Sequence, residues 1–110
     1  MQTKEAIKKY IELWGCDGHS IIKSESLVEM GFDQEFVNSY SYDHQSGQSY
    51  KSMIFDKRGN KMSSVMGVYT LDFLYAMAKD CGADITEARN KMGRGFQAGC
   101  LVAALQKVIE

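Results

Sequence analysis

Between Gly18 and Met66 the spacing of apolar residues changes from one typical of strands to one typical of helices and back. The order of these segments restricts the fold more than any other feature of the sequence. Residues 18–24 predict a short strand centred on Ser20–Lys23. Residues 25–40 hold two runs of helical spacing. Residues 50–55 and 61–66 mix aromatic, β-branched and polar residues around the turn signal Gly59-Asn60, which predicts a hairpin. We therefore expect strand, helix, tight turn, helix and hairpin in succession.

This succession resembles a winged helix-turn-helix. Two helices cross sharply in that motif, and Gly31 supplies the permissive turn residue between them. In the winged version, a strand before the second helix pairs with the hairpin after the third, and Ser20–Lys23 has that place. The apolar residues around the turn have the spacing that buries two helices against each other; they are Met30, Phe32, Val37 and Tyr40. Leu27 departs from the pattern, because a small residue usually permits the close approach. An αα-hairpin followed by a β-hairpin is the alternative.

Met30-Gly31-Phe32 also resembles the loop of ubiquitin-associated domains, which bind ubiquitin through that loop. Such domains consist of three short helices. The hairpin predicted after Ser49 does not fit them, so the winged-helix resemblance accounts for more of the chain.

The remainder of the chain is predicted to be helical. Thr3 and Gly15 bound a first helix, and Thr70 and Gly82 bound another, by their preference for helix ends. Asp84 with Glu87 predicts a short helix that ends near Met92, and a last helix runs from about Phe96 to Ile109. The fold class expected is α+β. We predict one mostly helical domain over residues 1–110 with a small β-hairpin sheet. Its core would be winged helix-turn-helix-like, and extra helices would follow at the C-terminus.

Composition narrows the class of protein. The formal net charge is −1 over 110 residues, so nucleic-acid binding would have to come from a local patch. The three cysteines (Cys16, Cys81 and Cys100) are widely spaced without a CxxC pair, and no secretory segment opens the chain, which predicts reduced thiols and a cytoplasmic protein. No apolar run reaches the length of a membrane span, so no membrane contact is expected.

Charge separates the two helices from the hairpin. Glu25, Glu29, Asp33 and Glu35 lie on the helix pair, and no lysine or arginine occurs between Lys23 and Lys51. An acidic helix in the major groove would lose the counterion-release term that dominates DNA affinity. The predicted hairpin instead has a net charge of +3. We expect its cations to contact phosphates, with Arg94 extending the patch; the nucleic-acid-binding residues predicted are Lys51, Lys57, Arg58, Lys61 and Arg94.

Other residue groups lack a catalytic or metal-binding pattern. Gly93–Ala98 fits G-x-G-x-x-[GA], but a dinucleotide-binding turn needs a strand before it and an acidic residue about twenty positions after it; a turn whose free amides and Arg94 hold an anion is the alternative. Cys16, Asp17 and His19 are close in sequence, yet nothing completes a nucleophilic site. The histidines and cysteines do not have zinc-ligand spacing. We therefore expect no catalytic residues, metal or cofactor.

These patterns predict a small non-enzymatic regulatory protein with a winged-helix-like core that binds nucleic acid through a basic hairpin. The alternative is a protein-binding adaptor or inhibitor, in which Glu29, Asp33 and Glu35 of the acidic helix-turn-helix face contact a basic protein partner. A winged-helix regulator is often a homodimer, and the last helix would supply that contact.

Overall fold

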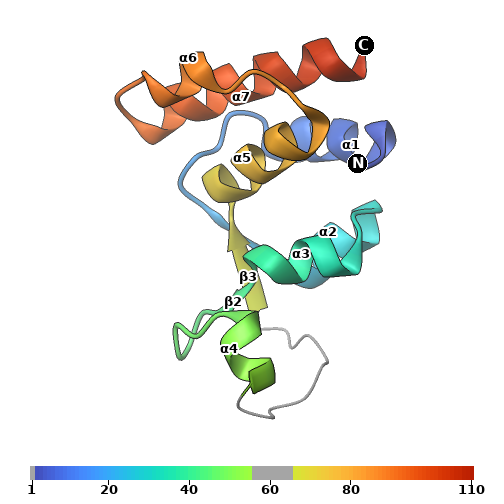
Figure 1. Ribbon diagram of the computed structural model, residues 1–110, viewed down its shortest axis with the longest axis vertical. Helices are drawn as coiled ribbons and strands as arrows, with labels where there is room; N and C mark the ends of the chain where they lie inside the picture. The colour runs from blue at the N-terminus through green and yellow to red at the C-terminus, as the bar shows by residue number, and fades with distance from the viewer. Residues whose placement is uncertain (1, 56–65) are drawn as a thin grey trace.

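The computed structural model describes residues 2–55 and 66–110, which form an α+β domain with a three-stranded sheet. Its elements are α1 (Lys4–Trp14), β1 (Ile21–Lys23), α2 (Ser24–Met30), α3 (Gln34–Tyr40), β2 (Tyr42–Asp43), α4 (Tyr50–Phe55), β3 (Met66–Tyr69), α5 (Thr70–Cys81), α6 (Thr86–Arg89) and α7 (Arg94–Ile109). Figure 1 shows α1, α5, α6 and α7 at one end, and α2, α3, the sheet and α4 towards the other. The predicted α+β class is confirmed.

The sheet is antiparallel throughout, in the order β1-β3-β2. Ile22 lies opposite Val68 in the β1–β3 pair, and Tyr42 lies opposite Gly67 in the β2–β3 pair. The predicted strand at Ser20–Lys23 is confirmed as β1. The central strand, β3, leads directly into α5, so the sheet and the C-terminal helices are joined without a loop (Figure 1).

Local capping explains where most helices begin and end. The hydroxyl of Thr3 accepts a hydrogen bond from the Ala6 amide, and the Asp33 carboxylate accepts one from the Phe36 amide, as side chains at helix N-termini do. Gly31 ends α2 in the left-handed conformation that glycine tolerates. The predicted cap at Thr70 is wrong, because this residue is the first of α5 and no side-chain cap is made there.

Aromatic rings join α1, α3 and α5 across the core. Tyr10, Phe32, Phe36 and Phe73 make edge-on and tilted contacts with centroid distances from 4.9 to 6.2 Å. Leu27, the departure from the helix-turn-helix pattern, is fully buried in the same core. Phe32 is only 3% exposed, so its ring, in the loop that resembles ubiquitin-associated domains, is not available to a partner.

The predicted hairpin is the main correction. Residues 50–55 form helix α4 rather than a strand, and residues 56–65, with the turn signal at Gly59-Asn60, lie outside the described residues. The hydroxyl of Ser49 accepts a hydrogen bond from the Ser52 amide, so a local cap favours a helix there. Strand β2 comes from the segment between the predicted helix pair and the predicted hairpin. Met66 lies in β3, and β2 takes the place of the first hairpin strand.

The C-terminal helices follow the prediction with shifted ends. The short helix α6 stops at Arg89 rather than near Met92, and α7 begins at Arg94 rather than Phe96. The Asp84 carboxylate accepts a hydrogen bond from the Thr86 amide, whereas the N-cap position of α6 is Ile85. No helix within residues 2–55 and 66–110 has the length and apolar character needed to cross a bilayer.

Candidate nucleic-acid interface

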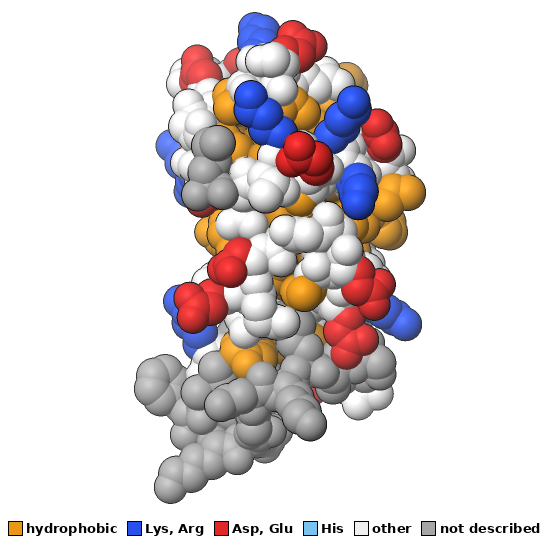
Figure 2. Space-filling view, turned by 90° about the vertical axis from the view of Figure 1, so that its right-hand side faces the viewer, with side chains coloured by type: hydrophobic (Ala, Val, Ile, Leu, Met, Phe, Trp, Pro, Cys, Tyr) orange, Lys and Arg blue, Asp and Glu red, His pale blue; other side chains and the backbone are white. Residues whose placement is uncertain are grey.

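The surface of α2 and α3 is acidic, as predicted. Glu25, Glu29, Asp33 and Glu35 are all exposed. Figure 2 shows two groups of acidic side chains over this half of the molecule, each with a cation beside it. The Asp33 carboxylate also caps α3, so this charge has a structural role. A phosphate backbone would be repelled by this surface.

The sheet presents a face of different chemistry. Paired residues and alternate residues of a strand project on the same side, so Ile21, Lys23, Tyr42, Gly67 and Tyr69 share one face. The opposite face carries Ile22 and Val68 and is buried in the core. We call the first of these faces the open sheet face. The residues of the open sheet face are exposed or half-buried, except Gly67, which is buried.

Two tyrosines stack on the open sheet face. The rings of Tyr42 and Tyr69 lie 4.8 Å apart at an interplanar angle of 16°. The imidazole of His44 meets the Tyr42 ring edge-on at 5.5 Å. Tyr69 is the outer ring of the pair and is 41% exposed. Such an exposed ring offers its remaining surface to a planar ligand.

Glycine at position 67 is required by the close approach of His44. A Cβ atom at Gly67 would collide with the imidazole of His44 and would lie 2.7 Å from Cγ2 of Ile21. No side chain fits there unless both of these neighbours move. Gly67 therefore lets the segment after β2 fold back over the sheet beside the tyrosine pair.

The Tyr42 hydroxyl is the most shielded polar group of this face. It is closed off from solvent and has no hydrogen-bond partner among the residues that the structure describes. Burial, and then the neighbouring Tyr69 and Asp72, raise the pKa of Tyr42 above its ordinary value.

A hollow of about 290 Å³ adjoins Tyr69. Tyr69, Leu71, Asp72 and Arg94 line it, so an aromatic ring, a carboxylate and a guanidinium converge at the ends of β3 and α7. Asp72 also lines a second hollow of about 460 Å³ with Tyr42, Tyr75 and Lys79. A planar ring, a hydrogen-bond acceptor and a cation are the groups that hold a nucleotide base and its phosphate.

The predicted cations are spread along the molecule. Arg94 borders the hollow beside Tyr69, whereas Lys51 is exposed on α4. In Figure 1, α4 lies beyond the Met66 end of β3, and α7 lies beyond its other end. Lys57, Arg58 and Lys61 lie outside the described residues. Lys23, Tyr42 and Tyr69 were missed by the sequence analysis, because strand pairing alone brings them together.

The remaining sequence candidates show no catalytic geometry. The Asp17 carboxylate accepts hydrogen bonds from the backbone amides of His19 and Ser20 and so shapes the turn. A hydrogen bond from the Ser20 hydroxyl, and then these backbone bonds, lower the pKa of Asp17. Helix α6, rather than a strand, precedes Gly93, which excludes the dinucleotide-binding interpretation. Residues 2–55 and 66–110 contain no cluster of histidine, cysteine or carboxylate side chains suited to a metal.

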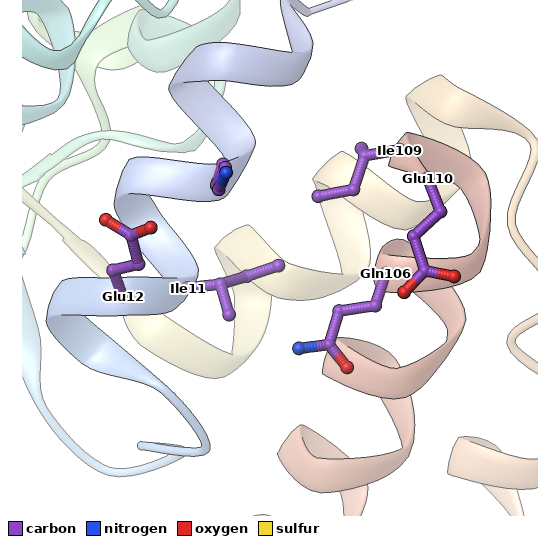
Figure 3. A pocket seen from close by; sticks show the side chains of 6 residues that line it. Ile11, Glu12, Gln106, Ile109 and Glu110 are labelled. Atoms are coloured by element: carbon purple, nitrogen blue, oxygen red, sulfur yellow. The ribbon is translucent and has the colours of Figure 1, made fainter.

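A third hollow, of about 420 Å³, lies between α1 and α7. Figure 3 shows Ile11 of α1 and Ile109 of α7 extending towards the space between the two helices, with Gln106 beside them. Lys8, Glu12 and Glu110 surround it with mixed charge. Among the described residues, no aromatic side chain lines this hollow, whereas Tyr69 lines the hollow beside the open sheet face.

Comparison with known proteins provides no family for the chain. No protein-family model, curated protein or solved structure matches it. The functional conclusion therefore depends on the geometry of these surfaces.

Proposed function

We propose that this protein is a small non-enzymatic regulator that binds nucleic acid through the open sheet face and the basic connection between β2 and β3. The observation that carries the proposal is the exposed Tyr42–Tyr69 stack, beside a hollow that Arg94 and Asp72 line. Aromatic side chains on an open sheet bind unpaired bases by stacking, and cations around them bind the phosphates. The expected ligand is a strand with unpaired bases.

The order of elements supports a winged-helix-like core. The succession α1, β1, α2, α3, β2, β3, with a sheet in the order β1-β3-β2, is the succession expected of a winged helix-turn-helix. In that comparison, the connection between β2 and β3 would take the place of the wing, and its sequence contains Lys51, Lys57, Arg58 and Lys61. The acidic α3 would make a poor reading helix, so the contact moves to the wing and the sheet.

The hollow beside Tyr69 suggests how a base would be held. A base stacked on Tyr69 would bring its edge to the Asp72 carboxylate, which accepts a hydrogen bond from an exocyclic amino group such as N4 of cytosine. Arg94 would neutralise the adjacent phosphate. Lys23, opposite Gly67 on the same face, would contact the strand further along.

Fluorescence anisotropy with a labelled oligocytidine of about 20 nucleotides tests the proposal. We expect binding that weakens steeply between about 50 and about 200 mM salt, and weaker binding to a duplex of equal length. Tyr69→Ser should weaken binding by about 1–3 kcal/mol, the usual effect of losing one stacking ring. Absence of binding at low salt would contradict the proposed function.

Two further variants separate stacking from charge. Leu13→Ser removes an exposed apolar side chain on α1, outside both hollows that Asp72 lines, and it should leave binding unchanged. Replacing Lys57, Arg58 and Lys61 with glutamate should reduce the magnitude of the salt slope by about 2, at roughly 0.7 per phosphate contact for a single strand. If the triple variant binds like the native chain, the connection between β2 and β3 is not part of the interface.

A second candidate is a protein-binding adaptor or inhibitor that uses the acidic surface. Glu25, Glu29 and Glu35 are exposed there, and Tyr40 adds an exposed aromatic ring. These groups would complement a basic segment of a partner. Titration of the ¹⁵N-labelled protein with a lysine-rich peptide tests it: amide shifts on α2 and α3, lost in the Glu29→Gln and Glu35→Gln double variant, would favour this candidate. Unchanged α2 and α3 amides would exclude it.

A further inference from the structure

The hollow beside Tyr42 is larger than the one beside Tyr69, and we call them the Tyr42 hollow and the Tyr69 hollow. The Tyr42 hollow has a volume of about 460 Å³, and four residues at helical spacing on α5 line it: Asp72, Tyr75, Ala76 and Lys79. Ala76 is buried and has only a methyl group, which leaves depth between its longer neighbours. Asp72 lines the Tyr69 hollow as well. The stacked pair therefore has a hollow beside each ring, and one carboxylate borders both.

Hydroxyl groups predominate among the polar side chains that the structure describes around the Tyr42 hollow. They belong to Ser39, Tyr40, Ser41, Tyr42, Ser49 and Tyr75. The charged residues of the described lining, Asp72 and Lys79, balance each other. The hollow thus has no excess of cations to bind a phosphate of its own. A neutral group that carries a hydroxyl suits this lining better, because it can bond both to the carboxylate and to the lining hydroxyls.

Internal hydrogen bonds decide how two of these hydroxyls can bond to a ligand. The Tyr75 hydroxyl donates to Oε1 of Gln97 at 2.8 Å, and Nε2 of that amide donates to the Lys91 carbonyl at 3.1 Å, which fixes the orientation of the amide. The Ser39 hydroxyl donates to the Glu35 carbonyl at 3.0 Å. Both protons are therefore committed, and the remaining lone pairs can only accept. Such a lining favours a ligand that donates a hydrogen bond.

We propose that the Tyr42 hollow binds a ribose, so that the protein prefers RNA to single-stranded DNA. This inference rests on the proposed function and names the class of strand. A base stacked on Tyr69 occupies one oxygen of the Asp72 carboxylate, and the other oxygen accepts the 2′-hydroxyl of the neighbouring nucleotide. The Tyr75 and Ser39 oxygens bond to the same hydroxyl directly or through water. Deoxyribose lacks this hydroxyl and would leave the acceptors that it covers without a partner.

Three labelled oligocytidines of about 20 nucleotides test the proposal by fluorescence anisotropy on the full chain. They differ only in the 2′ substituent, which is hydroxyl, hydrogen or fluorine. The hydroxyl strand should bind about three- to tenfold more tightly than either of the others, which is the usual effect of one hydrogen bond. Fluorine keeps the sugar pucker of RNA but cannot donate, so it separates hydrogen bonding from sugar shape. Equal binding of the hydroxyl strand and either of the others would overturn the proposal.

The outcomes for the two proposals are distinct. Equal affinity for all three strands would overturn the ribose subsite and leave the proposed nucleic-acid binding intact. Absence of binding by every strand at low salt would overturn both. Cytidine monophosphate should displace the RNA strand poorly at the same concentration of nucleotide, because a single nucleotide gains nothing from the neighbouring subsite. Equally effective displacement would identify a free ribonucleotide as the ligand and overturn the assignment to RNA.

Variants in the Tyr42 hollow locate the ribose. Ser39→Ala combined with Tyr75→Phe removes two acceptors of this hollow, and it should lower the preference for the hydroxyl strand about twofold or more. Gln97→Ala is the matched control, because it breaks the same hydrogen bond with Tyr75 but leaves the phenol oxygen in place, and it should keep the preference. An unchanged preference in the double variant would overturn the proposal.

The shared carboxylate provides a second comparison. Asp72→Ala should remove the preference for the hydroxyl strand, because this carboxylate borders both hollows. Glu87→Ala removes an exposed carboxylate of α6 that lines neither hollow, and it should leave the preference unchanged. A ribose preference that persisted in Asp72→Ala would place the 2′-hydroxyl elsewhere and overturn the proposal.

Discussion

The α2–α3 surface and the open sheet face lie close together in the fold, but they differ in how much their residues contribute to the hydrophobic core. The helix pair buries Leu27, Phe32 and Val37 beneath its charged exterior, so its residues are needed for the core. The open sheet face places Tyr69 largely outside the core, and the buried side of β3 is occupied by Val68. The difference indicates that the sheet face has side chains available for a ligand, whereas the helix pair is committed to folding.

Phe32→Ala should give the largest effect and tests this division most directly. Phe32 packs edge-on against both Tyr10 and Phe73, so its truncation should cost about 3–5 kcal/mol of unfolding free energy. Tyr69→Ala, on the open sheet face, should cost about 1 kcal/mol or less. Urea unfolding followed by circular dichroism measures both. Equal costs would remove the distinction between the two surfaces.

Gly67→Ala should have the next largest effect. The new methyl group must displace both His44 and Ile21, and such overpacking usually costs about 1–3 kcal/mol. Gly95→Ala is the control, since its methyl group would enter open space. Denaturant unfolding gives the stability, and oligocytidine binding reports whether the tyrosine pair keeps its geometry. A Gly67→Ala variant as stable as the native chain would show that His44 does not need this glycine.

Removing carboxylates from the helix pair should strengthen nucleic-acid binding modestly. Glu29→Gln with Glu35→Gln relieves repulsion of phosphates, by about 0.5–1 kcal/mol at low salt and less as screening increases. Asp33 is left in place because it caps α3. Anisotropy titrations at two salt concentrations measure the change. Weaker binding by the double variant would mean that the acidic helices themselves contact the ligand.

Tyr42→Phe should alter the alkaline stability of the protein. The folded state raises the pKa of Tyr42, so its contribution to stability is complete below the ordinary tyrosine pKa of about 10 and is lost as the pH rises through the folded value. The Tyr42→Phe variant should therefore lose less stability than the native chain above about pH 10. Urea unfolding across this pH range measures the difference, and parallel pH profiles would contradict a raised pKa.

The smallest expected effect is a preference among bases, which we attribute to the Asp72 carboxylate. Binding to oligocytidine should exceed binding to oligothymidine, because cytosine presents an amino group and the thymine edge presents O4 there. Asp72→Ala should remove the preference, while Asp80→Ala, a nearby change on α5, should leave it. Competition anisotropy measures the ratio. A preference that persisted in Asp72→Ala would place base recognition elsewhere.

Elements with strong local signals were predictable from the sequence. Helices α1, α2, α3, α5 and α7 each carry several apolar residues at helical spacing and a glycine or capping residue near an end. Strand β2 is only two residues long, too short to show any alternation. Residues 50–55 were misassigned because aromatic and β-branched residues favour strands, although the cap at Ser49 was a readable signal for a helix.

The candidate sites could be predicted only in part. Arg94 and the acidic residues of α2 and α3 were identified by charge and lie on the surface. The Tyr42–Tyr69 pair was not identified, because its members are far apart in sequence and meet only through the register of β2 with β3. The exposure of Phe96 on α7 was equally hidden, since a sequence does not state which side of a helix packs inward.

The sequence by itself determined the helix pair, its acidity, the first strand and the C-terminal helices, because periodicity, caps and charge are local properties. Only the tertiary structure decided which strand lies at the centre of the sheet, which side of that sheet is open, and which rings stack there. Those features depend on pairing between distant segments, and a shift of one residue would exchange the buried Val68 for Tyr69.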